Sequence, residues 1–137
     1  MSMENVRKEF YKEYLEDYID EFSDQKWNMI KEHIATHKYL LNEDYKNEIS
    51  LTEAYTSWIE YVWEPFIFAV EYTKLLEYSD FDILNLYETI SFDWKNLKDE
   101  TPKELKQIGI DDATKHYCIQ LKEYPWWRKT LLKIKGA

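Results

Sequence analysis

The sequence predicts an all-α fold, an irregular bundle of five or six helices in a single domain that spans residues 1–137. Three observations support this prediction. The chain contains two glycines and three prolines in 137 residues, well below the usual shares of roughly 7% and 5%, so it is poor in the residues that tight turns and hairpins need. Apolar residues recur at helical spacing, and aromatic side chains, which supply much of a core, make up 18% of the chain. The length is typical of one domain.

The first two predicted helices together cover most of residues 4–42. The first runs from about Glu4 to Phe22, with apolar side chains on one stripe and charged ones opposite. The second begins near Ser23 or Asp24, since either side chain can accept the free backbone N–H groups of a first turn. It ends at about Asn42, and the polar residues 42–50 predict a loop.

Ser50 opens the clearest helix start in the chain. Ser50 and Glu53 have the spacing of a capping box, in which serine and glutamate satisfy two free amides reciprocally. The following segment, residues 51–63, is apolar on nearly all sides, so we expect residues 50–76 to be the central and most buried element. Pro65 lacks an N–H group, which predicts either a kink or a helix that restarts with the proline in its first turn.

Three further helix starts follow in the last 60 residues. Weaker capping boxes are predicted at residues 79–82 and, with proline at the first helical position, at residues 101–104, where the short helix ends at Gly109. Asp111 or Asp112 is expected to cap the next helix. In the last segment, which Pro125 begins, we expect one side to pack inward: Trp127, Leu131 and Ile134.

Composition limits the function classes. The net charge is −9, and residues 51–100 carry 11 acidic and 3 basic side chains, whereas residues 101–137 carry 4 acidic and 8 basic ones. An acidic body repels nucleic acid over most of its surface, so we do not expect direct nucleic-acid binding there. No apolar run approaches the roughly 20 residues of a membrane span, and the single cysteine, Cys118, is expected to be a buried thiol. These features predict a cytoplasmic protein without membrane contact or cofactor.

His33 and His37 are the weak candidates for a metal site. Their spacing of four places both imidazoles on one side of a helix, one turn apart. The chain has no Glu-x-x-His pair of the kind that di-iron helical proteins use, and no catalytic residue is indicated. We expect the two histidines to form hydrogen bonds or to lie partly exposed, with a metal site as the alternative.

Two groups of side chains are candidates for partner binding. The first group consists of acidic residues expected on solvated surfaces: Glu53, Glu60, Glu64, Glu71, Asp80 and Asp82. The second group lies in the basic C-terminal segment: Trp126, Arg128 and Lys129. Tryptophan beside cations is suited to packing on the acidic body, to a protein interface, to base stacking or to a membrane interface.

Part of the chain resembles a group of small uncharacterised bacterial proteins. The resemblance covers about residues 30–78 and follows the pattern H-x-Y-x-L, a short polar loop, E-A-x-x-x-W and V-[YW]-x-P. The matching segments are His37-Lys-Tyr-Leu-Leu41, Glu53-Ala54, Trp58 and Val62-Trp63-Glu-Pro65. The chain departs from the group's pattern at residues 77–82. The resemblance implies a helical fold in a bacterial or phage setting, and it transfers no activity.

These features favour a non-enzymatic interaction protein whose acidic face meets a basic protein surface. A specific form of this hypothesis is a small phage- or mobile-element-borne inhibitor that occludes the nucleic-acid groove of a host enzyme, with carboxylates in place of phosphates. One alternative is a DNA-binding regulator that uses the basic Trp-rich C-terminal segment. The others are a helical metal-binding protein centred on His33 and His37, and a structural homo-oligomer.

Overall fold

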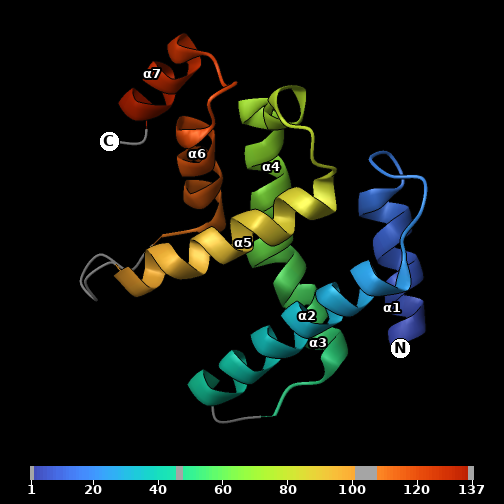
Figure 1. The fold of residues 1–137 in the computed structure, drawn as a ribbon. Coiled ribbons are helices and arrows are strands. Elements are labelled where there is room, and N and C mark those ends of the chain that lie inside the picture. Colours follow the sequence, from blue (N-terminus) through green and yellow to red (C-terminus); the bar gives the residue numbers. More distant parts are fainter. Residues whose placement is uncertain (1, 46–47, 101–107, 136–137) are drawn as a thin grey trace. The chain divides into compact units, whose positions relative to one another are not determined.

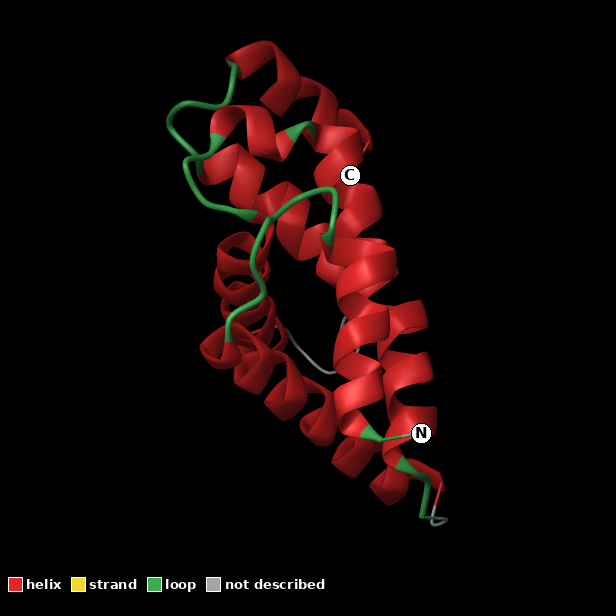
Figure 2. Cartoon of the chain, turned by 90° about the vertical axis from the view of Figure 1, so that its right-hand side faces the viewer, coloured by secondary structure: helices red, strands yellow, loops and turns green. Residues whose placement is uncertain are grey.

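The computed structural model describes residues 2–45, 48–100 and 108–135, and within these ranges the protein is all-α (Figures 1 and 2). The described residues form helices and turns with no strand, which confirms the predicted fold class. The described residues form six helices when each π-helical turn is counted with the helical segments that adjoin it, so that residues 51–73 count as one helix. The chain divides into two compact units, unit 1 (Met1–Tyr61) and unit 2 (Val62–Ala137). The single-domain expectation stays a prediction.

Unit 1 is built on the packing of two helices against a third. Its helical segments are α1 (Met3–Phe10), the π-helical turn η1 (Tyr11–Leu15), α2 (Asp24–Tyr45) and α3 (Leu51–Trp58). Helices α1 and α2 both contact α3. Phe10 is the centre of the core, with its ring centroid 5.5 Å from Trp58 and 6.0 Å from Phe22. Edge contacts of this kind stabilise a core beyond the burial of area alone.

The first helix is shorter than its apolar stripe predicts, because α1 and η1 end at Leu15 and not at Phe22. Two side chains fix the returning chain. The Tyr11 hydroxyl donates to the carbonyls of Ile19 and Asp20, and the Arg7 guanidinium donates to the carbonyl of Phe22 at 2.9 Å. Phe22 is therefore buried by a turn in the chain, although its spacing also suits a continued helix.

The starts of α2 and α3 agree with the sequence prediction. The Ser23 hydroxyl accepts a hydrogen bond from the amide of Lys26 at the start of α2. At α3, the Ser50 hydroxyl accepts from the Glu53 amide at 3.1 Å, and the Glu53 carboxylate accepts from the Ser50 amide at 3.2 Å. The capping box is confirmed. The end of α2 lies at Tyr45, later than Asn42, so the predicted loop is shorter.

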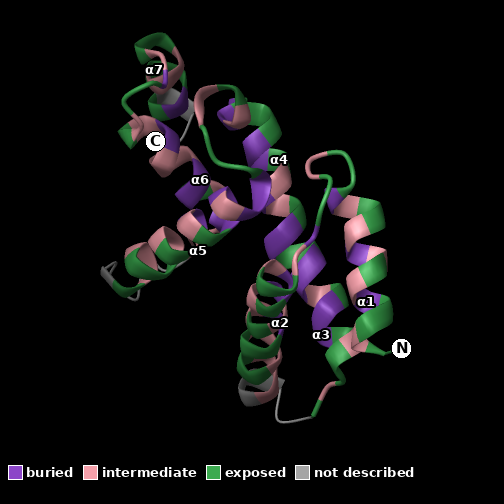
Figure 3. Cartoon of the chain, turned by 45° about the vertical axis from the view of Figure 1, so that its right-hand side comes forward, coloured by how far each residue is buried: buried purple, intermediate pink, exposed green. Residues whose placement is uncertain are grey.

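In unit 2, three helices pack against a fourth, α6 (Ile110–Gln120). The segments from the unit boundary onward are the π-helical turn η2 (Ile59–Trp63), α4 (Glu64–Thr73), the 3₁₀ turn η3 (Leu75–Tyr78), α5 (Ile83–Glu100), α6 (Ile110–Gln120) and α7 (Trp126–Lys135). The boundary between the units falls within η2. Helices α4, α5 and α7 each contact α6, and Figure 3 shows broad buried surfaces on α4 and α6.

The core of unit 2 contains a triangle of aromatic rings. Trp63, Phe66 and Tyr87 are all fully buried, and their three centroid separations are 5.3 to 5.4 Å. Pro65 lies near the start of α4, directly after the π-helical turn, and Trp63 before α4 also has helical backbone angles. The helix therefore continues through the π-helical turn and does not restart at the proline. A proline is tolerated beside a π-helical turn because the regular i→i−4 hydrogen-bond pattern is already interrupted there.

Two predicted caps in unit 2 are displaced by a few residues. The side chain of Asp82, and not that of Ser79, caps α5 by accepting from the Asn85 amide at 2.8 Å. Gly109 is the N-cap of α6, and Asp112 lies in the first turn, where its carboxylate accepts from the Gly109 amide at 2.9 Å. Asp112 therefore takes part in the cap from the first turn of the helix and is not the N-cap residue. The predicted box at residues 101–104 lies outside the described residues.

The orientation of α7 is a correction to the sequence prediction. Trp127 and Leu131, expected to pack inward, are 47% and 51% exposed, whereas Leu132 is buried; the side chain of Ile134 lies outside the described part. The segment before α7 is fixed by the buried Tyr124, whose hydroxyl donates to the Thr73 carbonyl at 2.9 Å. This contact lies two residues before the start of α7.

Candidate functional site

A small pocket in unit 1 brings His37 together with a serine that no sequence pattern singled out. His37 Nε2 lies 2.8 Å from Ser57 Oγ, within hydrogen-bond distance. The pair joins α2 to α3 at the edge of a cavity of about 430 Å³. The remaining lining residues are Leu41, Ile49, Glu53 and Tyr61. Twenty residues separate His37 from Ser57 in the chain, so no local motif signals the pair.

Burial lowers the pKa of His37 below its ordinary value, because desolvation penalises the charged imidazolium. The imidazole is therefore neutral at pH 7 and can share a proton with Ser57. A serine beside a neutral base is one part of a nucleophilic site, and acyl transfer also needs donors for the developing oxyanion. Ser57 is the seventh residue of α3, beyond the first turn where helix amides are free. The arrangement is suited to hydrogen-bonding a polar ligand.

Of the residues that line this pocket, His37 and Glu53 have side chains that can ligate a metal ion, and the Glu53 carboxylate already accepts a hydrogen bond from the Ser50 amide. His33, one turn before His37 on α2, is half-buried and does not line the cavity. Across residues 2–45, 48–100 and 108–135, no group of three His, Cys, Asp or Glu side chains is placed to hold a metal ion. The structure pairs His37 with Ser57.

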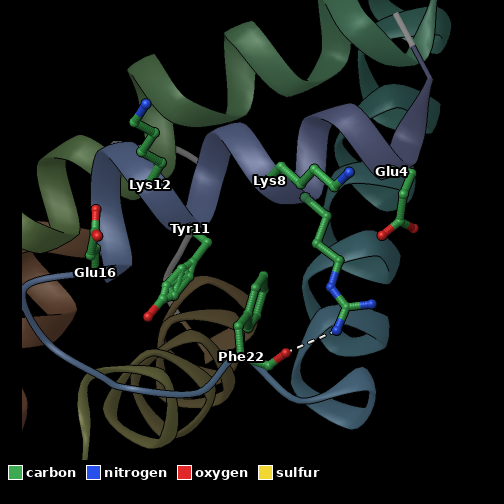
Figure 4. Close-up of a pocket in the computed structure, with 7 residues that line it drawn as sticks. Glu4, Lys8, Tyr11, Lys12, Glu16 and Phe22 are labelled. Carbon is green, nitrogen blue, oxygen red and sulfur yellow. Dashed lines mark hydrogen bonds between the residues drawn. The ribbon is translucent and has the colours of Figure 1, made fainter.

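A second hollow of unit 1, about 540 Å³ in volume, lies between α1 with η1 and the segment that ends at Phe22 (Figure 4). Glu4, Lys8, Lys12 and Glu16 follow one another along it at intervals of four residues, and Lys8 and Lys12 are exposed. The two positive charges lie between two negative ones. Arg7 is engaged by Phe22 and by Asp24, whose carboxylate lies 2.9 Å away. The hollow therefore does not concentrate charge of one sign.

The six acidic candidates are all exposed, but two of them also serve as helix caps. Glu53 belongs to the capping box of α3, and Asp82 caps α5. Glu60 lies in η2. Asp80 precedes the start of α5. Glu64 and Glu71 both lie on α4, in unit 2.

Glu64 and Glu71 share the outward side of α4 with two large aromatic residues. Phe68 is 71% exposed and Tyr72 is 44% exposed. The spacings i, i+4, i+7 and i+8 place Glu64, Phe68, Glu71 and Tyr72 on one side of a helix; together they are called the α4 face below. The opposite side of α4 is buried, at Phe66, Ala69, Val70 and Thr73.

Phe68 and Tyr72 were not predicted as surface residues, because α4 is rich in apolar side chains throughout. A signal was present in the glutamates, since Glu64 and Glu71 lie four residues before and three after Phe68 and therefore mark the side of the helix that contacts water. An exposed aromatic pair with carboxylates beside it is typical of an interaction surface.

The C-terminal candidates lie on α7. Trp126 is 77% exposed, and Lys129 and Arg128 are half-buried. The Arg128 guanidinium lies 4.7 Å from the centroid of the Trp127 ring and 5.7 Å from that of Tyr78. Arg128 therefore helps to hold α7 on unit 2, while Trp126 and Trp127 remain accessible.

No protein-family model, curated protein or solved structure matches this chain. The resemblance over residues 30–78 stays a prediction. None of the helices in the described part is both long enough and apolar enough to cross a membrane.

Proposed function

We propose that this chain is a non-enzymatic interaction protein that binds a basic protein surface through the α4 face. The observation that carries the proposal is the exposure of Phe68 and Tyr72 beside two exposed carboxylates. Large exposed aromatic residues are the usual anchors of protein interfaces, and charges beside them set partner choice and association rate. A partner that fits this face has an apolar groove with Lys or Arg along one edge.

The specific form of the proposal is an inhibitor that occludes a nucleic-acid-binding groove of a host protein. Support comes from the charge of the middle of the chain, where 11 acidic side chains stand against 3 basic ones. Carboxylates held on rigid helices compete with phosphates for the same Lys and Arg side chains. On this proposal, binding weakens as salt rises, since exposed charge pairs are screened.

The test is affinity capture from the native host at about 0.05 M salt, where screening is weak. The variant F68A/Y72A removes the aromatic anchors of the α4 face. Phe92 on α5 is 65% exposed, so F92A is the matched control that removes an equally exposed ring elsewhere in unit 2. We expect one basic protein to be retained by wild type and F92A, lost by F68A/Y72A and released at about 0.5 M salt.

Two outcomes contradict the proposal. Retention of the same protein by F68A/Y72A places its binding elsewhere, and binding that is unchanged at about 0.5 M salt contradicts the role of charge. The inhibitor form of the proposal predicts that the retained protein binds DNA or RNA and that added nucleic acid releases this protein from the complex. A complex that added nucleic acid does not release contradicts the inhibitor form.

A second candidate function, a DNA-binding regulator, is favoured by the exposure of Trp126 and Trp127 beside Arg128 and Lys129. Exposed tryptophans stack on unpaired bases, and cations beside them contact phosphates. The candidate predicts that the purified protein retards DNA in a gel at low salt. Charge reversal at Arg128, Lys129 and Lys133 must abolish the retardation, and an unchanged shift in that variant excludes the candidate.

A further inference from the structure

The cavity beside His37 in unit 1 combines apolar walls with a few polar groups that converge on it. Leu41 and Ile49 are half-buried on its walls, and the third apolar ring, that of Tyr61, is 65% exposed. Its polar lining residues are His37, Ser57 and Glu53. A concave site of a few hundred Å³ with this kind of lining is typical of small-molecule binding.

The lining side chains follow two helical rows. His37 and Leu41 are one turn apart on α2, and Glu53, Ser57 and Tyr61 follow one another at intervals of four residues along α3 into η2. Residues four apart lie on the same side of a helix, about 5–6 Å from each other. The hydrogen bond between His37 and Ser57 joins the two rows. This polar pair therefore lies between a charged end, at Glu53, and an aromatic end, at Tyr61.

The cavity presents a negative charge and hydrogen-bond acceptors, and none of its described lining residues is a lysine or an arginine. Glu53 uses Oε1 to accept from the amide and the hydroxyl of Ser50, which leaves Oε2 without a hydrogen-bond partner among the described residues. Burial lowers the pKa of His37, so the imidazole is neutral at pH 7 and does not repel a cation. These groups favour a ligand with an ammonium group and disfavour one with a carboxylate.

The walls of the cavity are held by contacts within the chain. The Ile49 amide donates to Asn42 Oδ1 at 2.9 Å, which fixes the segment before α3. The capping box of Ser50 and Glu53 fixes the first turn of α3. A ligand therefore meets a site that is already formed, and little further ordering of the chain is needed when it binds.

We propose that this cavity binds a small aromatic amino alcohol, in which an ammonium group, a hydroxyl group and a ring follow one another in that order. The ammonium group contacts Glu53 Oε2, and the hydroxyl joins the hydrogen bond between His37 and Ser57. The ring packs against Tyr61 at the other end. The order of the three groups in the ligand is the order of the side chains along the cavity. The inference goes beyond the proposed function, because the cavity belongs to unit 1 and the α4 face to unit 2.

The test is an NMR titration of the isotope-labelled full chain with phenylethanolamine, the simplest compound with this order of groups. The amide chemical shifts report both the position of binding and its strength. We expect shifts confined to amides around the cavity, among them those of Ile49 and Ser57. The dissociation constant should be about 0.1–1 mM, as for a ligand of this size.

Four related compounds test the role of each group of the ligand. Phenethylamine lacks the hydroxyl and α-methylbenzyl alcohol lacks the amine, so each should bind about three- to tenfold more weakly. Isopropanolamine has a methyl group in place of the ring and should bind at least about tenfold more weakly. Phenylserine adds a carboxylate next to the ammonium group, and it should lose at least about tenfold because no cation lines the cavity to receive it.

Two variants pair each polar group of the ligand with its side chain. S57A should weaken phenylethanolamine to the level of phenethylamine and leave phenethylamine itself within about twofold. E53Q should weaken phenylethanolamine about three- to tenfold and leave α-methylbenzyl alcohol within about twofold, while glutamine preserves the capping box. The matched control is E16Q, because Glu16 is an exposed carboxylate of unit 1 that does not line this cavity. The amide spectrum shows whether each variant is folded.

Four results overturn the proposal. The first is the absence of shifts around the cavity at about 10 mM phenylethanolamine, well above the expected dissociation constant. The second is phenylserine or isopropanolamine binding as tightly as phenylethanolamine. The third is equal weakening by E53Q and E16Q, which assigns the binding to general attraction by an acidic protein. The fourth is S57A weakening phenethylamine as much as phenylethanolamine.

The same variants separate this inference from the proposed function. F68A/Y72A changes the α4 face and should bind phenylethanolamine as wild type does. S57A changes the cavity and should still capture the host protein. Loss of capture in F68A/Y72A without any binding of the amine therefore overturns the amine site alone, and amine binding without capture overturns the proposed function alone.

Discussion

Two phenylalanines on α4, two residues apart, should differ widely in their contribution to stability. Phe66 is fully buried, with ring centroids 5.4 Å from Trp63 and from Tyr87. Replacement by alanine removes the transfer free energy of the ring and leaves a cavity, so F66A should lower the free energy of unfolding by about 3–5 kcal/mol. Phe68 is 71% exposed, so F68A should change it by less than about 0.5 kcal/mol, helped by the higher helix propensity of alanine.

The assay is urea unfolding followed by circular dichroism at 222 nm, with thermal melts as a second measurement. F66A should lower the melting temperature by about 10 °C or more, and F68A should leave it almost unchanged. Because the chain forms two compact units, hydrogen exchange of peptides from α4 to α6 identifies which part loses protection in F66A. Equal losses in F66A and F68A would refute the assignment of the buried and outward sides of α4, and with it the α4 face.

Three further predictions concern unit 1 and the buried thiol. S50A should destabilise the protein by about 1 kcal/mol and S50G by only a few tenths in urea unfolding, because glycine is itself a tolerated N-cap; equal losses would contradict the capping role. Since the pKa of His37 is lowered in the folded state, the unfolded chain takes up its proton first, so stability should fall as pH decreases below about 6.5. In H37Q the urea midpoint should change less with pH than in the wild type. An unchanged pH dependence would show that other groups cause it. Burial raises the pKa of Cys118 to about 11 from 9.0, which lowers its thiolate fraction about 100-fold; rapid alkylation of the native protein would contradict this.

Local signals in the sequence predicted the helices whose ends are set by neighbouring residues. Ser50 with Glu53 and Ser23 before α2 are examples, because a cap is a contact over three residues. The same holds for the buried positions of α2 and α3, where Trp27, Ile30 and Trp58 follow the apolar stripe. In these cases the periodicity of the sequence and the tertiary packing agree.

The mismatches arise where a distant contact decides the outcome. The first helix ends at Leu15 because Tyr11 and Arg7 hold the carbonyls of the returning chain. The segment before α7 is held by the hydrogen bond between Tyr124 and Thr73, which are 51 residues apart. Neither contact has a local signature, so the inward side of α7 was predicted wrongly.

Only part of the candidate site was predictable from the sequence, because the rest depends on contacts between residues distant in the chain. The exposure of Glu64 and Glu71 follows from charge alone, and both residues were predicted on a solvated surface. The aromatic part of the face did not follow, because Phe66 and Phe68 belong to one apolar segment and only the orientation of α4 separates them. The pairing of His37 with Ser57 requires α2 and α3 to be packed together.

Site-specific photo-crosslinking tests the central claim, that the α4 face is the surface at which this protein binds its partner. A benzoyl-phenylalanine at position 68 or at position 92 replaces a phenylalanine of similar exposure, 71% and 65%, so the two probes differ in location and little else. With the captured partner present, we predict a crosslinked product from the probe at position 68 and none from the probe at position 92. Equal labelling from both probes, or labelling from position 92 alone, would contradict the account.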